Sequence, residues 1–181
     1  MSLLLSRGLG LPSLFVGAYP SACPFECGFT FVVDLTKGAS DVNPTYRATA
    51  ISTARASNGH LGYLHAPIED RATHAKSMLE LLHGQLLPAL LDAWEGNHRI
   101  LIHCREGKSR SVTVAAAFLM KLHGRDGLFS EADVAREGGL VGAAVAFIRR
   151  ARACAKPNKG FVRTLQQLHL QLEAEQEEAS V

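Results

Sequence analysis

Long apolar runs are missing from this chain. No stretch of its 181 residues approaches the ~20 consecutive apolar residues that a membrane-spanning helix needs. Residues 1–22 loosely resemble a signal peptide, but Arg7, Pro12 and three glycines interrupt the apolar run. We therefore expect a protein without a membrane span, located in the cytoplasm, with the nucleus as a second compatible compartment.

The chain also has few cysteines, no spacing typical of a metal site and a small net charge. Four cysteines, spaced unevenly, are not the pattern of a secreted disulfide scaffold. Cys23 and Cys27 lie close together, but no second ligand pair at zinc-finger spacing follows, and the eight histidines are scattered. A formal net charge of +2 is too small to indicate a nucleic-acid or membrane surface. These observations predict a reduced intracellular protein with no metal, no cofactor and no nucleic acid as a stable partner, and they leave the oligomeric state open.

What the sequence has is the composition of one globular domain. Hydrophobic residues make up 47% and charged residues 20% of the chain. We expect a single domain over residues 1–181, with an acidic tail at 173–181 that forms a solvated helix end or frays. Apolar, β-branched and aromatic residues concentrate in four predicted strands, at 14–16, 29–35, 62–68 and 99–103, with a turn region at 37–40 after the second.

Helical patterns occupy most of the remaining sequence. Leucines at helical spacing predict a helix over 75–94, kinked or split because it contains Gly84 and Pro88. A further amphipathic helix follows residue 110 and is expected to stop at Gly124. The last two predicted helices cover 140–155 and 161–172. This order favours an α/β fold, with a central, mostly parallel sheet of about four to five strands flanked by helices that are concentrated in the C-terminal half.

Residues 103–111, HCREGKSRS, place a cysteine at the end of a predicted strand and an arginine at the start of a predicted helix. When such a loop wraps around one centre, its backbone N–H groups and the positive end of the helix together bind an anion such as phosphate. Gly107 permits the tight turn that this requires. The expected substrate-binding residues are Arg105, Glu106, Gly107, Lys108, Ser109 and Arg110.

The same loop predicts chemistry as well as binding. Convergent N–H groups favour a thiolate at Cys104, which can attack phosphorus and form a cysteinyl-phosphate intermediate. The planar guanidinium of Arg110 can bind two phosphate oxygens at once, and Ser111 can donate a hydrogen bond to the sulfur as it leaves. The alternative is that Cys104 is a buried free cysteine with no role, but this would leave the accompanying glycine, arginine and serine unexplained.

This loop resembles the signature loop of the dual-specificity protein phosphatases, within the cysteine-dependent protein tyrosine phosphatase superfamily. The resemblance includes the pieces SLFVGAYPSA, FVVDLT, YLHAPIED, RILIHC and KPNKGF, in the family's order, and covers most of residues 14–172. It implies a cysteine-phosphatase-like fold and a metal-independent hydrolase. The chain departs from the compact family pattern at 124–139, which has the character of an insertion with a short helix capped around Ser130 and Asp133.

The family also places an acidic residue on a loop ahead of the nucleophile, where it protonates the leaving oxygen. Asp70 fits this role, with Glu69 as its neighbouring rival. Asp70 could instead cap the helix that follows it. His103 is not needed as a base and is assigned, with Asn158 of the KPNKGF turn, to a supporting role around the loop.

The substrate class stays open between three readings. The resemblance implies a shallow pocket that accepts phosphotyrosine, phosphoserine and phosphothreonine in proteins. Lys108 could instead favour a polyanion such as a phosphoinositide or an RNA 5′ end, or it could simply be solvated. The third reading is a phosphoprotein-binding module without turnover. A basic run either holds an acidic substrate flank or forms a solvated helix face; its members are Arg149, Arg150, Arg152, Lys156 and Lys159.

Overall fold

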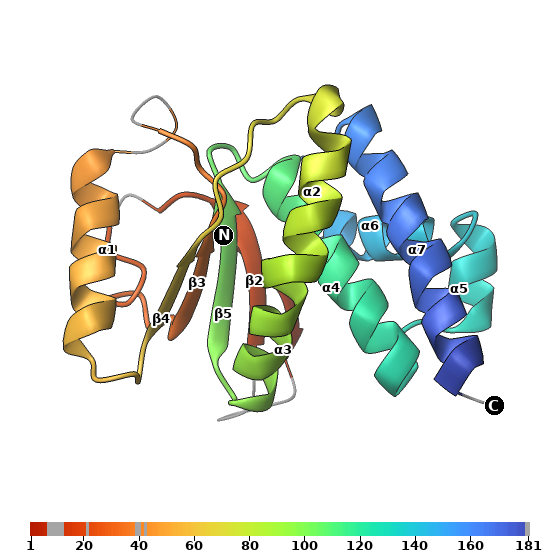
Figure 1. The fold of residues 1–181 in the computed structure, drawn as a ribbon, viewed down its shortest axis with the longest axis horizontal. Helices are drawn as coiled ribbons and strands as arrows, with labels where there is room; N and C mark the ends of the chain where they lie inside the picture. Colours follow the sequence, from red (N-terminus) through yellow and green to blue (C-terminus); the bar gives the residue numbers. More distant parts are fainter. Residues whose placement is uncertain (7–12, 21, 39–40, 42, 180–181) are drawn as a thin grey trace.

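A five-stranded sheet forms the centre of the molecule (Figure 1). The computed structural model describes residues 1–6, 13–20, 22–38, 41 and 43–179. The strands are β1 (Ser2–Ser6), β2 (Ser13–Ala18), β3 (Phe31–Asp34), β4 (Gly62–His65) and β5 (Arg99–Cys104), in the spatial order β1-β2-β5-β3-β4. Four strands are parallel, and β1 pairs antiparallel with β2 at one edge. The predicted α/β class is confirmed, whereas β1 was not expected from the sequence.

The central strand of this sheet is β5, which pairs with β2 on one side and β3 on the other. Its residues Ile100, Leu101 and Ile102 are fully buried, because helices or loops cover both faces of the sheet. A short apolar run without alternation is the sequence pattern of such a strand. Residues 39–40 of the predicted turn after the second strand lie outside the described residues.

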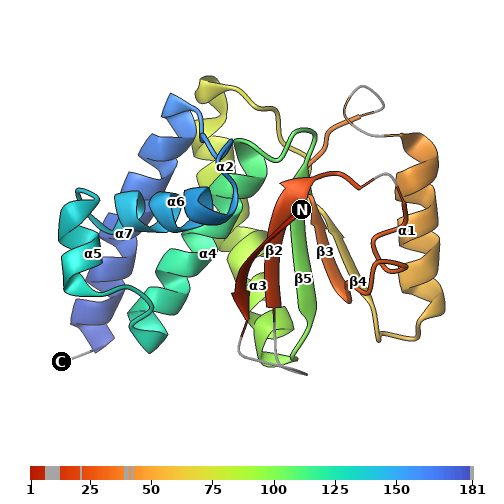
Figure 2. The ribbon, with the colours of Figure 1, turned by 180° about the vertical axis from the view of Figure 1, so that it is seen from behind.

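Helices cover the sheet unequally (Figures 1 and 2). The helix α1 (Pro44–Ala56) lies alone on one face, and the other helices gather on the opposite face. The sequence pattern did not predict α1, whose buried residues are only Tyr46 and Ala50. Its start is nevertheless well defined locally, because Asn43 accepts a hydrogen bond from the Thr45 N–H at 2.9 Å and Pro44 occupies the first turn.

The predicted helix at 75–94 is three consecutive helical pieces. After the short η1 (Ala72–His74), the chain forms α2 (Ala75–Leu81), a π-helical turn η2 (Leu82–Leu86) and α3 (Leu87–Glu95). Gly84 lies within the π turn and Pro88 in the first turn of α3. The split expected from these two residues is therefore present.

The next helix, α4 (Arg110–Asp126), continues past its predicted end. The prediction that Gly124 stops it is wrong. Gly127 ends the helix in the left-handed conformation, with its N–H bonded to the His123 carbonyl at 2.8 Å. A Cβ at Gly124 would lie 2.3 Å from Nε2 of Gln176, which is the far end of a flexible side chain and can move aside. The predicted insertion at 124–139 thus begins inside α4.

The C-terminal part contains three more helices, α5 (Glu131–Arg136), α6 (Leu140–Ala151) and α7 (Lys159–Ala179). The expected cap of α5 is present, since the Ser130 hydroxyl accepts from the Asp133 N–H at 3.1 Å. The helix α6 ends at Ala151, four residues before the predicted end. The acidic tail continues α7 as far as Ala179, and residues 180–181 lie outside the described part. Among the described helices, none has the length and apolar character needed to cross a membrane.

Candidate active site

The strand β5 and the helix α4 hold the predicted anion loop between them. Cys104 is the last residue of β5 and Arg110 the first residue of α4. The carboxyl ends of parallel strands β2, β3 and β4 meet beside that of β5, which is where ligands bind in open α/β sheets. The topology therefore brings distant loops to the edge that carries Cys104.

The sulfur of Cys104 faces the inside of the loop. The residue is 1% exposed, and Sγ lies 3.2 Å from the donating N–H of Gly107 and 3.3 Å from the Ser111 hydroxyl. Gly107 has a φ of 67°, and a Cβ at this position would lie 2.3 Å from the backbone carbon of Gly17. Glycine is therefore required both for the turn and for the close approach to β2.

Arg152 braces the apex of the loop from outside. Its Nε donates to the Gly107 carbonyl at 2.5 Å and its Nη2 to the Glu106 carbonyl at 2.9 Å. Because these carbonyls are engaged outward, the neighbouring N–H groups can face inward. In the sequence, Arg152 is recognisable only as one member of a basic run. The missing signal was the end of α6 at Ala151, which frees the next residue to turn toward the loop.

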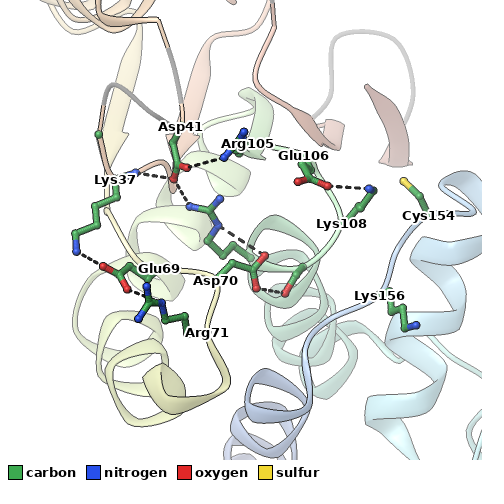
Figure 3. A pocket seen from close by; sticks show the side chains of 13 residues that line it. Lys37, Asp41, Glu69, Asp70, Arg71, Arg105, Glu106, Lys108, Cys154 and Lys156 are labelled. Atoms are coloured by element: carbon green, nitrogen blue, oxygen red, sulfur yellow. Dashed lines mark hydrogen bonds and ion pairs between the residues drawn. The ribbon is translucent and has the colours of Figure 1, made fainter.

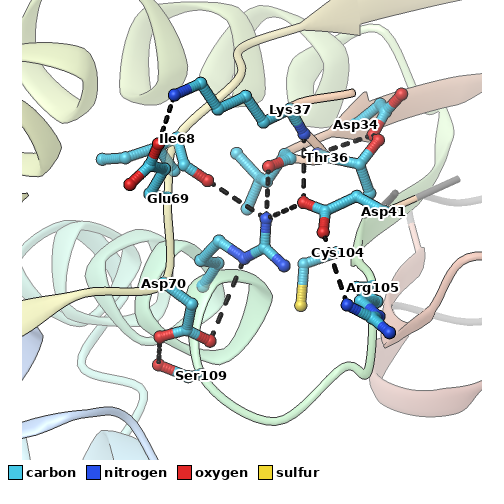
Figure 4. Close-up of polar contacts among 12 residues, drawn as sticks. Asp34, Thr36, Lys37, Asp41, Ile68, Glu69, Asp70, Cys104, Arg105 and Ser109 are labelled. Atoms are coloured by element: carbon cyan, nitrogen blue, oxygen red, sulfur yellow. Dashed lines mark hydrogen bonds and ion pairs between the residues drawn. The ribbon is translucent and has the colours of Figure 1, made fainter. Parts of the chain in front are cut away.

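Arg110 is buried beneath the pocket and is 4% exposed. Its Nη1 donates to the Leu35 carbonyl at 3.2 Å, the Ile68 carbonyl at 3.1 Å and Oδ2 of Asp41 at 2.7 Å (Figure 4). Burial opposes the charge of this guanidinium, but the hydrogen bond to Asp41 and the nearby anionic groups outweigh it and raise the pKa of Arg110. Asp41 was not among the residues expected from the sequence.

Asp70 lies next to the loop and is held by two donors. Its Oδ1 accepts from the Ser109 hydroxyl at 2.7 Å and from Nδ2 of Asn158 at 2.8 Å, while Oδ2 lies 3.9 Å from Nε of Arg110 (Figure 4). The alternative that Asp70 caps a helix is wrong, because Arg71 precedes η1 and His74 precedes α2. Neither of those positions has a side-chain cap.

The rival acid, Glu69, lies on the rim of the pocket. It pairs with Lys37 and, at 3.1 Å, with Nε of Arg71 (Figure 3). Both partners are exposed, so this carboxylate is engaged at the surface. Of the two neighbouring acids, Asp70 is the one that contacts the loop.

His103 belongs to a buried polar network under the loop. It is fully buried, and its Nε2 lies 2.9 Å from the Tyr46 hydroxyl. Burial lowers the pKa of His103 to about 4 against the opposing attraction of Asp34. The imidazole is therefore neutral at pH 7, although its Nδ1 lies 3.9 Å from Oδ1 of Asp34. It can orient the loop but is not a cationic partner.

The charge of the buried Asp34 is satisfied by other groups. Burial would raise the pKa of Asp34, but the proximity of His103 and hydrogen bonds from Thr36 and Tyr63 outweigh that and lower it. Because His103 is neutral at pH 7, we assign the lowered pKa of Asp34 mainly to the hydrogen bonds from Thr36 and Tyr63. Arg47 of α1 also reaches this carboxylate, with Nε 3.1 Å from Oδ2.

An open cavity of about 1000 Å³ lies above the loop (Figure 3). Its walls carry both signs of charge. The cations are Lys37, Arg71, Arg105, Lys108, Arg110 and Lys156, and the acids are Asp41, Glu69, Asp70 and Glu106. Lys108 is half exposed and pairs with Glu106 at 2.7 Å, so its charge is partly balanced at the rim.

The remaining members of the basic run point to different places. Arg149 donates to the Ala155 carbonyl at 3.2 Å, and Arg150 lies 3.7 Å from Asp133 of α5. Of the run, Arg152 contacts the loop and Lys156 lines the cavity, while Lys159 opens α7. Within the described ranges, no group of three or more His, Cys, Asp or Glu is arranged to hold a metal ion.

Comparison with known proteins assigns this chain to a family. Residues 14–130 match the family model described as dual specificity phosphatase, catalytic domain. Dual specificity protein phosphatase 1 of Arabidopsis thaliana is 33% identical over 90 residues, which cover 50% of this chain and 38% of that protein. Dual specificity protein phosphatase 22 of Xenopus tropicalis is 30% identical over 161 residues, which cover 86% of this chain and 61% of that protein. The match thus spans less than two thirds of either relative.

A solved structure agrees with this result. The crystal structure of human DUSP28 superposes with a TM-score of 0.63 at 25% identity, over 90% of this chain and 94% of that chain. The family model covers more than half of the sequence, including both edges of the anion loop. This chain belongs to the dual specificity phosphatase family.

Proposed function

We propose that this protein is a phosphatase that hydrolyses phosphate monoesters on tyrosine, serine and threonine residues of proteins. The observation that carries the proposal is the position of the Cys104 sulfur, enclosed by the loop and within hydrogen-bond distance of the Gly107 N–H and the Ser111 hydroxyl. A sulfur in this position can attack the phosphorus of an ester whose oxygens are bound by the loop, as nucleophilic catalysis requires.

In the first step, the thiolate of Cys104 attacks phosphorus, and the bond from phosphorus to the ester oxygen breaks. Oδ2 of Asp70 carries the proton that the leaving oxygen takes, because Oδ1 is occupied by Ser109 and Asn158. Backbone N–H groups of residues 105–110 and the guanidinium of Arg110 stabilise the charge on the three non-bridging phosphate oxygens. The product of this step is a cysteinyl-phosphate.

In the second step, water attacks the cysteinyl-phosphate. The Asp70 carboxylate accepts a proton from the water, and the bond from phosphorus to sulfur breaks, which regenerates the thiolate and releases inorganic phosphate. The Ser111 hydroxyl, 3.3 Å from Sγ, donates to the departing sulfur. No step in this scheme uses a metal or a cofactor.

A polyanionic substrate, such as a soluble phosphoinositide or an RNA 5′ end, is the second candidate. Lys108, Arg105 and Lys156 at the rim of the cavity favour it. The acids Glu106 and Asp41 oppose it, because they pair with Lys108 and Arg105. This balance of charge supports the phosphoprotein over the polyanion.

The proposal also includes the cellular compartment and the domain organisation of the protein. We assign the protein to a reducing compartment, the cytoplasm or the nucleus, on the support of four free cysteines: Cys23, Cys27, Cys104 and Cys154. We take residues 1–181 as a single catalytic domain, since one main hydrophobic cluster joins both halves of the described chain.

The test is phosphate release in the presence of a metal chelator. The substrates are an activated aryl phosphate, phosphopeptides with each of the three phosphorylated residues, and soluble phosphoinositides. We expect turnover of the aryl phosphate and phosphopeptides, abolished in Cys104→Ser. That variant should still bind tungstate, because the loop N–H groups and Arg110 remain. Tungstate binding by the wild-type protein without turnover of any ester would instead identify a binding module.

A further inference from the structure

Arg110 uses one nitrogen, Nη1, for its hydrogen bonds to the described residues. Each hydrogen bond that it makes to the described residues starts from Nη1, which reaches the Leu35 and Ile68 carbonyls and Oδ2 of Asp41. Nη1 carries two hydrogens, so these three acceptors occupy it completely. Nε is buried and has no hydrogen-bond partner among the described residues, with the Asp70 carboxylate 3.9 Å away.

An unpartnered N–H in a buried cation is costly unless a ligand satisfies it. The Nε and Nη2 atoms form the edge of a guanidinium that binds an oxyanion in a bidentate manner. The orientation of that edge depends on what holds the opposite corner, which is Nη1. The groups around Nη1 therefore decide whether the edge faces a phosphate above Cys104.

Among those three acceptors, only Asp41 supplies a charge. The Leu35 N–H bonds to the His103 carbonyl of β5 at 3.0 Å, and the Ile68 N–H bonds to the Leu35 carbonyl at 3.5 Å, so backbone contacts hold both segments. Asp41 is held as well, because Oδ2 accepts the Lys37 N–H at 3.2 Å and Oδ1 lies 4.0 Å from Nη1 of Arg105. Burial would raise the pKa of Asp41, but the hydrogen bonds from Arg110 and Lys37 lower it, so the carboxylate is charged at neutral pH.

We propose that Asp41 is a positioning residue for phosphate binding, which holds Nη1 of Arg110 so that the Nε–Nη2 edge of the guanidinium faces the substrate oxyanion (Figure 4). The inference deepens the proposed phosphatase activity and rests on it for the identity of the anion. The opposite role, in which Asp41 competes with phosphate for Arg110, predicts tighter anion binding when the carboxylate is removed.

The test measures tungstate affinity calorimetrically in a Cys104→Ser background, so that it does not depend on turnover. Asp41→Asn should weaken tungstate binding about 10-fold, the size expected for loss of a charge-assisted hydrogen bond. Asp41→Glu should recover part of that loss. The matched control is Glu69→Gln, which removes a carboxylate from the same rim that pairs with Lys37 and Arg71 rather than Arg110. This control should stay within about two-fold of the parent.

A double-mutant cycle separates positioning from a general structural effect. In an Arg110→Lys background, Asp41→Asn should have little further effect on tungstate binding, because the group that it positions is absent. Equal losses with and without the Arg110→Lys substitution, unchanged or tighter tungstate binding by Asp41→Asn, or an equal loss in Glu69→Gln would each overturn the inference. If the wild-type protein hydrolyses no ester but the predicted binding pattern is seen, the proposed function fails and the role of Asp41 stands.

Discussion

At the scale of single residues, the contacts of Asp70 and Glu69 show which of these two neighbouring acids lies against the loop. Oδ1 of Asp70 accepts hydrogen bonds from Ser109 and Asn158, and Oδ2 is the atom proposed to carry the proton. Glu69 is adjacent in sequence but is paired with exposed cations at the rim. The sequence predicted Asp70 with Glu69 as a rival, and it could not decide between them because both side chains follow the same strand.

Asp70→Asn should slow hydrolysis of alkyl phosphates by about 100-fold or more, the usual contribution of a general acid. An activated aryl phosphate should be affected much less, because its leaving oxygen needs little protonation. The comparison of kcat for phosphoserine peptide and aryl phosphate in the same variant checks this. Equal losses for the two substrates would remove Asp70 from the role of proton donor.

At the scale of elements, the loop depends on what packs against its two sides. Gly107 approaches the backbone of β2 at Gly17 on one side, and Arg152 holds the carbonyls of residues 106 and 107 on the other. The sequence predicted the need for glycine at position 107, since the requirement arises within the loop. It did not predict the brace, because that contact depends on where α6 ends.

Gly107→Ala should abolish most tungstate binding and turnover, since the new Cβ meets backbone at 2.3 Å in addition to the strain of a φ of 67°. Gly127→Ala is the matched control, with a φ of 61° and no atom within 4 Å of the added Cβ. It should cost about 1 kcal/mol in the free energy of unfolding and leave activity unchanged. Chemical denaturation and aryl phosphate turnover are measured for both variants. If backbone strain alone decides the outcome, Gly107→Ala and Gly127→Ala should lose similar stability and both should keep their activity.

Arg152→Ala should lower kcat/KM for an aryl phosphate by about 10-fold, because two hydrogen bonds from a charged donor to the loop are lost. Arg149→Ala is a suitable comparison, since Arg149 bonds to Ala155 at the end of the same segment and does not reach the loop. Its kcat/KM should stay near that of the wild type. Equal losses in the two variants would mean that the loss of a positive charge, and not the loss of the hydrogen bonds to the loop, lowers kcat/KM.

At the scale of the whole molecule, a buried polar network links α1 to the strands under the active loop. Tyr46 of α1 bonds to His103, and Arg47 bonds to Asp34. The titratable and charged groups around His103 are Asp34, Tyr46, Arg47, His65 and Arg110. This network makes the stability of the fold depend on pH, because a neutral imidazole is buried at its centre.

The free energy of unfolding should fall as pH drops from about 6.5 toward about 4, since the unfolded chain takes up a proton at His103 there and the folded chain does not. The contribution is fully favourable above pH 6.5 and decreases by about 1 kcal/mol between pH 7.5 and 5.5. His103→Asn should remove this part of the slope in denaturant unfolding measured across that range. His123, whose pKa burial also lowers, adds a slope of the same sign that the variant keeps. An unchanged slope in His103→Asn would mean that His103 is not buried in its neutral form.

The sequence by itself determined the class of fold and the strand, loop and helix that carry the proposed nucleophile. Cys104, Gly107 and Arg110 lie within one short loop, so their relation is set by local turns and by the strand and helix at its ends. Only the tertiary structure decided which distant groups complete the site. Asp41 is 69 residues from Arg110 along the chain, and Arg152 is 45 residues from Gly107. Contacts of this kind depend on how parallel strands and their crossover helices bring separate loops to one edge of the sheet, which no local pattern records.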